Sequence, residues 1–163
     1  MTASHLPVPR SRDALGLVAF LVLAFGVLVL GGRAAGPALA EWYPALRKPS
    51  WTPPGWAFGP VWALLYPMVA LAGWRAWREG RARRGLLLYL VQFALNAVWP
   101  WLFFAQRRLD LALLDVGVLF MAILATIVVF WRVHRSAALL LVPYLAWVGF
   151  AAALTHTIWR LNP

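Results

Sequence analysis

Five long apolar blocks dominate the sequence and fix what the chain can fold into. They run approximately over residues 14–32, 58–77, 86–104, 111–131 and 137–159. A helix needs about 20 mostly apolar residues to cross the hydrocarbon core of a bilayer, and each block is long enough. The blocks are too long for barrel strands and do not alternate apolar with polar residues. The sequence therefore predicts an all-α membrane protein with a bundle of five transmembrane helices.

The composition agrees with a membrane protein and excludes several other classes. Apolar types make up 63% of the 163 residues and charged types 12%, which is too little polar surface to cover a soluble fold. The formal charge of +10 comes from basic residues that lie mostly between the apolar blocks, so we expect a lipid bilayer rather than nucleic acid as a partner. The chain has no Cys, which excludes disulfides, thiolate metal sites and Cys nucleophiles.

The short connections between the last four blocks force neighbouring helices to run antiparallel. We therefore expect one transmembrane domain over residues 14–163, preceded by a cytoplasmic or flexible tail over residues 1–13. Nine Lys and Arg residues fall on the N-terminal side of the bundle and six on the other, which favours a cytoplasmic N-terminus. The first block also resembles a signal peptide, but it is long for one, and the cleavage-like Ala38-Leu39-Ala40 lies several residues beyond it.

The one long connection, residues 33–57, does not have the composition of a flexible linker. It carries five large apolar or aromatic side chains, stiffened by five prolines: Trp42, Tyr43, Leu46, Trp51 and Trp56, with Pro37, Pro44, Pro49, Pro53 and Pro54. Such a segment loses little entropy when it becomes ordered and has large faces to bury. It is expected either to form a structured lid over one mouth of the bundle or to place its rings at the lipid headgroups as an aromatic belt.

The third block carries a polar face. Tyr89, Gln92, Asn96 and Trp99 follow steps of three, four and three residues, so they share one side of a helix. Polar groups in hydrocarbon need partners, and this face is therefore expected to point into the bundle. There it serves either as hydrogen-bonding contact between helices or as part of a ligand pocket.

Aromatic residues recur inside two other blocks. Trp62 and Tyr66 lie four residues apart in the second block, and Tyr144 and Trp147 lie three apart in the fifth. Rings from several helices, together with the amide face of the third block, could line a cavity for a flat apolar ligand. The alternative is an aromatic core without a cavity.

The ionisable residues inside the spans include one carboxylate and one imidazole. Asp115 is one turn inside the fourth block, where a structural cap paired with Arg107 or Arg108 is expected rather than a proton relay. His156 is the one His within a span. It has no second ligand at metal-binding spacing, so no metal site is predicted.

Ordered motifs extend from the long connection to the last block. They are W-Y-x-x-L-x-K-P-S-W-x-P-P over residues 42–54, G-P-V-W-x-x-L-Y over 59–66, Q-F-A-L-N-A-V-W-P over 92–100, A-L-L-D over 112–115 and P-Y-L-A-W over 143–147. Together they resemble the TspO/MBR family, which comprises the translocator protein, or peripheral-type benzodiazepine receptor, and the bacterial tryptophan-rich sensory proteins.

The resemblance implies a five-helix bundle whose first loop covers a pocket for porphyrins such as protoporphyrin IX and haem, with no cofactor required. It implies tetrapyrrole transport, sensing or stress-linked regulation in a bacterial cell membrane. The alternatives are an enzyme for light- and oxygen-dependent porphyrin degradation and a structural membrane protein. Family members often form homodimers, and Gly149 with Ala153 is a pair of small residues suited to a helix contact or a dimer face.

The resemblance also implies roles for individual residues. Trp62 and Trp147 match two family tryptophans tied to porphyrin degradation, and they are catalytic only if that activity is real. Trp51 matches a loop tryptophan that caps the pocket, and Gln92 is expected to donate a hydrogen bond to the ligand. The remaining pocket positions are Tyr66, Asn96, Trp99, Ala151 and Leu154. Sterol binding is doubtful, because His156 stands where the cholesterol motif of animal members has Tyr.

Overall fold

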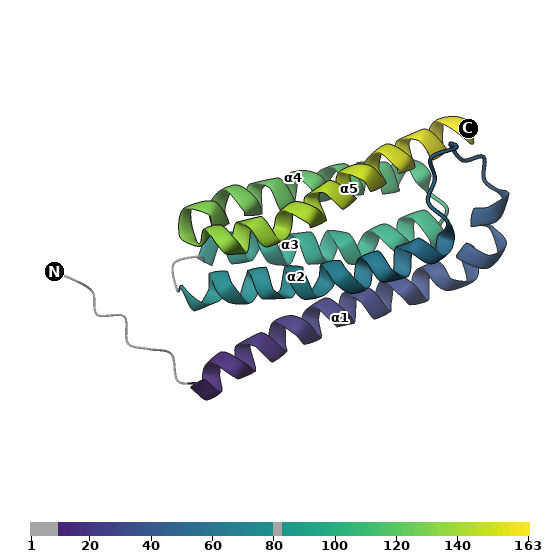
Figure 1. Ribbon diagram of the computed structural model, residues 1–163. Coiled ribbons are helices and arrows are strands. Elements are labelled where there is room, and N and C mark those ends of the chain that lie inside the picture. Colours follow the sequence, from purple (N-terminus) through teal and green to yellow (C-terminus); the bar gives the residue numbers. More distant parts are fainter. Residues whose placement is uncertain (1–9, 80–82) are drawn as a thin grey trace.

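The computed structural model describes residues 10–79 and 83–163 and is a bundle of long helices that lie side by side (Figure 1). All five long helices are long and apolar enough to cross a membrane. They are α1 (Arg10–Glu41), α2 (Phe58–Arg78), α3 (Arg83–Pro100), α4 (Leu109–Val133) and α5 (Arg135–Leu161). The predicted five-helix membrane bundle is confirmed. Of the expected tail, residues 1–9 lie outside the described residues and residues 10–13 form the first turn of α1.

The first helix is longer than the apolar block that predicted it. The expected span ended at residue 32 and the loop began at residue 33, but α1 continues to Glu41, so the loop is residues 42–57. Ala34, Ala35 and Ala38 are buried along this extension, which packs against the loop and the end of α3. Pro37 is tolerated inside the helix because it lies on the exposed side, where the carbonyl that it leaves unpaired does not face the core.

Helix order in space follows from the short connections. α4 packs against α3 and α5, α1 packs against α2 and α3, and α2 also contacts α5. Because the bundle has an odd number of spans, the start of α1 and the end of α5 lie at opposite ends of the molecule (Figure 1). We call these the N-terminal end and the loop end, since residues 42–57 lie beside the end of α5.

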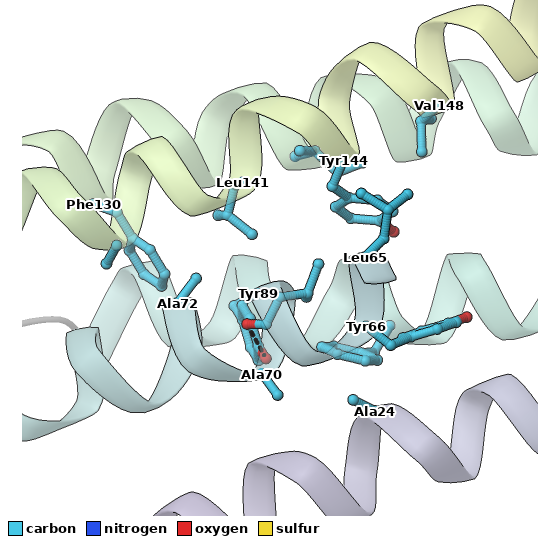
Figure 2. Close-up of a cluster of buried hydrophobic side chains, with 14 of the residues drawn as sticks. Ala24, Leu65, Tyr66, Ala70, Ala72, Tyr89, Phe130, Leu141, Tyr144 and Val148 are labelled. Atoms are coloured by element: carbon cyan, nitrogen blue, oxygen red, sulfur yellow. Dashed lines mark hydrogen bonds between the residues drawn. The ribbon is translucent and has the colours of Figure 1, made fainter. Parts of the chain in front are cut away.

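The N-terminal half of the bundle is densely packed around Tyr89. This residue of α3 is fully buried, and its hydroxyl donates a hydrogen bond to the carbonyl of Val69 at 3.0 Å, drawn as a dashed line in Figure 2. Gly73 of α2 makes room for the ring, because a Cβ at that position would lie 2.7 Å from the Tyr89 Oη and 2.8 Å from a ring carbon of Phe20. Gly85 plays the same part for Phe130.

The same half is closed along the seam between α1 and α2. Asp13 forms an ion pair with Arg78 at 3.0 Å, and its carbonyl accepts a hydrogen bond from the Trp74 indole at 3.0 Å. The Trp77 ring lies directly over Gly16. These contacts hold the start of α1 against the end of α2.

The loop is ordered by contacts of its own. The Lys48 ammonium donates hydrogen bonds to the carbonyls of Tyr43, Pro44 and Leu46 at 2.7–3.0 Å. The Asn162 side-chain amide pairs with both backbone groups of Arg47, accepting at 3.0 Å and donating at 2.9 Å. The loop therefore forms a structured cap that is fixed to the end of α5.

Candidate ligand-binding site

A cavity of about 220 Å³ lies in the loop half of the bundle. All five long helices contribute to its wall, and the wall is mainly apolar and aromatic. Six of the residues predicted for a ligand site line it: Trp62, Tyr66, Asn96, Trp99, Trp147 and Ala151. The structure therefore favours the expected cavity over a solid aromatic core.

Two tryptophans from different helices form one corner of the cavity. The rings of Trp62 on α2 and Trp147 on α5 lie edge to face, with centroids 6.4 Å apart and planes at 88°. Trp62 also packs against Tyr66 at 5.2 Å, and Trp147 stacks on Phe150 at 5.3 Å. Because both indoles are braced by further rings, the corner is pre-organised for aromatic contact with a ligand.

A hydrogen-bonded network of three side chains includes two residues of the wall, Tyr66 and Asn96, and extends to Tyr144, which does not line the cavity. The Tyr66 hydroxyl donates to the Asn96 Oδ1, and the Asn96 Nδ2 donates to the Tyr144 hydroxyl at 2.9 Å. Tyr66 of α2 and Tyr144 of α5 are both buried, and their hydrogen bonds to Asn96 join these helices to α3. The amide of Asn96 retains one N–H and one lone pair, and the indole N–H groups of Trp99 and Trp147 have no partner among the described residues, so the wall keeps a few polar groups for a ligand.

Three predicted ligand residues do not line the cavity. Gln92 is fully buried one turn from Asn96, and its amide has no hydrogen-bond partner among the described residues. Leu154 lies one turn beyond Ala151, where it belongs to a smaller apolar cluster with Tyr43. Trp51 is 47% exposed and packs on Phe150, 5.7 Å from it, so it covers the ring behind Trp147 without reaching the cavity.

The sequence patterns missed the contribution of α1. Leu28, Gly31, Gly32, Ala35 and Leu39 line one side of the cavity, and three of them lie in or beside the segment that was predicted to be loop. None is polar or aromatic, so their residue types did not mark them as part of a site. A run of small residues on one side of an apolar helix was the available signal, because small side chains leave room for a cavity.

A local change of helix type shapes the wall at the end of α3. After Pro100 the chain forms a single turn of π-helix, η3 (Trp101–Ala105), with the Gln106 N–H bonded to the Trp101 carbonyl at 2.8 Å. Pro100 and Phe104 both line the cavity. A π-turn changes the direction of the side chains that follow it, and such turns are frequent at functional sites.

The cavity is closed toward the loop by an aromatic plug. Leu39, Phe58 and Phe104 line it on that side, and Tyr43 packs behind them, 6.5 Å from Phe58 and 5.9 Å from Phe104 between ring centroids. Tyr43 is only 7% exposed, and this burial raises the pKa of its phenol above the ordinary value. The plug therefore separates the cavity from the water that reaches the loop.

The ionisable residues inside the spans play no part in the cavity. Asp115 is buried, but the expected partners lie elsewhere, since Arg108 pairs with Asp110 at 2.7 Å and Arg107 lies over the Trp42 ring. The expectation of a cap paired with Arg107 or Arg108 is therefore wrong. His156 is exposed beside Trp159. Within residues 10–79 and 83–163, no group of three His, Asp or Glu residues could hold a metal ion.

The sequence matches a known family and several known proteins. Residues 18–160 match the TspO/MBR family. The chain belongs to this family. Its relatives include Protein CrtK of Rhodobacter capsulatus, 36% identical over 153 residues that cover 91% of this chain and 96% of the relative. Tryptophan-rich protein TspO of Chlorobaculum tepidum is 40% identical over 151 residues, covering 88% and 96%.

An animal protein belongs to the same set. The human Translocator protein is 41% identical over 127 residues, which cover 75% of each chain. TspO/MBR membership, together with the five apolar helices, establishes a multi-pass integral membrane protein. The family match confirms the resemblance that the ordered motifs predicted.

Proposed function

We propose that this TspO/MBR protein binds a flat apolar tetrapyrrole, such as protoporphyrin IX or haem, in the cavity of the loop half. It would act in the transport, sensing or stress-linked regulation of that ligand. The observation that carries the proposal is the convergence of Trp62, Trp99 and Trp147, from three different helices, on one cavity. Indole faces bind large π systems well.

The cavity is smaller than a porphyrin requires. Pockets for drug-sized ligands span about 300–1,000 Å³, and the cavity of about 220 Å³ lies below that range. A porphyrin therefore binds only if the wall moves outward. The α1 side can move most readily, because it carries small residues and contributes no hydrogen bond to the Tyr66–Asn96–Tyr144 network.

A cavity-filling variant tests the proposal. Ala151→Phe places a ring in the cavity, whereas Ala153→Phe places the same ring on the exposed side of α5. We expect Ala151→Phe to weaken protoporphyrin IX binding at least tenfold, measured in the dark by the shift of the porphyrin absorption band. Ala153→Phe serves as the matched control and keeps the affinity of the original protein. Equal binding by both variants would place the ligand elsewhere.

A second function is favoured by the contact between Trp62 and Trp147. If an excited porphyrin sits against this pair, either indole is close enough to donate an electron during light- and oxygen-dependent degradation. Trp62→Phe with Trp147→Phe would then slow the bleaching of bound protoporphyrin IX under illumination. Trp131→Phe, at a half-exposed position of α4, is the control. Identical bleaching rates would leave binding as the function and remove the enzymatic alternative.

A further inference from the structure

We infer that the cavity opens sideways into the membrane between α1 and α2, at Gly32 and Gly59, and that Arg33 at the rim of this opening selects ligands that carry an anionic group. The inference rests on the proposed function and adds to it the route and the charge of the ligand. It follows from four features of the described residues: two glycines, the plug, the α1–α2 register and the position of Arg33.

The two glycines line the cavity and are also exposed. Gly32 and Gly59 both belong to the wall, and both have large exposed fractions. A Cβ at either position would meet no heavy atom within 4 Å, apart from chain neighbours and the local helix backbone. On α1 the neighbours on the outer side of Gly32, Val29 and Arg33, are exposed as well. Gly32 therefore lies at the edge between the cavity and the lipid, with no side chain to seal it.

The register of the helices brings these glycines close to the same level. α1 and α2 run antiparallel, and Phe20 of α1 lies against position 73 of α2. Twelve residues farther along α1, Gly32 is level with about residue 61 of α2, within one turn of Gly59. Gly32 and Gly59 therefore lie at similar levels of the two helices, on the loop side of the contacts that Asp13 makes with Trp74 and Arg78.

The groove beside the loop shares only Leu39 with the wall of the cavity. Leu39, Phe58 and Phe104 cover the cavity from that side, with Tyr43 packed behind them. The loop itself is held to the end of α5 by the two hydrogen bonds between Asn162 and Arg47. A ligand from water would have to displace the loop and the plug, whereas a ligand in the bilayer faces only two glycines.

Arg33 lies at the depth of the lipid headgroups. The apolar run before it, residues 15–32, spans about 27 Å at 1.5 Å per residue, close to the thickness of the hydrocarbon core of about 30 Å. Arg33 is exposed, and no ion pair joins it to another described residue. Its guanidinium can pair with a carboxylate at the headgroup level while the apolar body of the same molecule lies beside Gly32. The fitting ligand is a flat amphipathic anion dissolved in this leaflet.

The test measures association and dissociation rates of protoporphyrin IX with the full-length protein in phosphatidylcholine vesicles. Gly32→Phe should plug the opening and slow both rates at least tenfold. Gly26→Phe is the matched control, since it lies on an exposed part of the same helix with open space around it. Asn162→Ala frees the loop and should leave the association rate unchanged.

Two outcomes of this experiment would overturn the inference. Faster association in Asn162→Ala, with Gly32→Phe unchanged, would show that ligands pass through the loop. An increase in Kd without a change in the association rate of Gly32→Phe would show a filled cavity rather than a blocked opening. If the original protein binds no porphyrin at all, the proposed function itself fails and takes the inference with it.

The charge of the ligand is tested separately. Arg33→Gln should slow the association of protoporphyrin IX at least threefold and leave the association of its neutral dimethyl ester unchanged. Equal slowing of both compounds, or of neither, would contradict a role for the Arg33 charge. Arg132→Gln, at an exposed position of α4 in the N-terminal half, is the control and should affect neither compound.

Discussion

The two halves of the bundle use glycine in opposite ways. In the N-terminal half, Gly73 and Gly85 are surrounded by aromatic rings, and a single added carbon at either would lie within 3.0 Å of a neighbouring side chain. In the loop half, Gly32 and Gly59 border open space. The same residue type permits close packing at one end and leaves a cavity at the other. The comparison indicates that the N-terminal half supplies stability and that the loop half supplies the space for the proposed ligand.

Packing density explains why the two tasks are separated. A close-packed core gains dispersion energy from every contact, and a cavity forfeits those contacts for the atoms that line it. A bundle with a cavity must therefore be held together by contacts elsewhere. Tyr89, Phe130 and the ion pair between Asp13 and Arg78 provide them in the N-terminal half.

Gly73→Val should have the largest effect, and it tests the close packing of the N-terminal half. The added side chain would collide with Tyr89 and Phe20, and overpacking of a rigid core costs about 3 kcal/mol at the upper end of its usual range. We expect a large loss of thermal stability in detergent, followed by circular dichroism. Gly26→Val, in open space on α1, should leave the melting temperature nearly unchanged. A tolerated Gly73→Val would show that the N-terminal half is not closely packed.

Asn96→Leu should have the next largest effect, and it acts at the boundary between the halves. The change leaves the buried hydroxyls of Tyr66 and Tyr144 without their partner, and each buried polar group left unpaired costs about 1–3 kcal/mol. Both the melting temperature and the porphyrin affinity should fall.

Tyr89→Phe is the matched control in the N-terminal half. It removes one hydroxyl and one hydrogen bond, to the Val69 carbonyl, for about 1 kcal/mol. Here the melting temperature should fall while ligand affinity stays the same. An affinity loss equal to that of Asn96→Leu would argue against a separation of the two functions.

Asn162→Ala should have a smaller and local effect. Loss of the two hydrogen bonds to Arg47 should lower the free energy that holds the loop in its ordered state by about 1 kcal/mol. Limited proteolysis should then cut residues 42–57 faster, whereas the helices keep their protection. Asn162→Asp retains the hydrogen-bond acceptor but not the donor, so its rate of cleavage should lie between those of the original protein and Asn162→Ala. Unchanged cleavage would mean that the loop is held by its own contacts, such as those of Lys48.

The smallest expected change is a gain in stability. Gly32→Ala adds a methyl group in open space and removes the helix penalty of glycine, worth about 0.5–1 kcal/mol. Its melting temperature should rise slightly, whereas Gly73→Ala should lower it. Two shifts of the same sign would show that the surroundings of these glycines do not differ as described.

The sequence predicted the elements better than the site. Block length and hydropathy were enough for five spanning helices, because the bilayer sets a fixed thickness for each. The end of α1 could not be placed in the same way. Gly31, Gly32, Arg33 and Pro37 all weaken a helix or an apolar run in isolation, and burial of the neighbouring alanines is what extends the helix.

Periodicity correctly grouped Asn96 with Trp99 but could not fix which neighbour each side chain faces. Gln92 shares their helix face by spacing, yet it is enclosed by protein one turn away from the cavity. Leu154 likewise turns into the smaller cluster. Such rotations depend on how helices pack against each other, and so do the π-turn after Pro100 and the contribution of α1. Neither the rotations nor the π-turn leaves a distinctive pattern along a single helix.

The Asn96 amide uses one donor and one acceptor in its hydrogen bonds with Tyr144 and Tyr66. Apart from the remaining N–H and lone pair of this amide and the indole N–H groups of Trp99 and Trp147, unpaired within the described part of the chain, the side chains of the wall are apolar or already bonded, so recognition there depends mainly on the outline and thickness of the ligand. Chemically unrelated flat molecules of similar width should compete with one another for this space. Such competition would mean that the protein selects its ligands by shape.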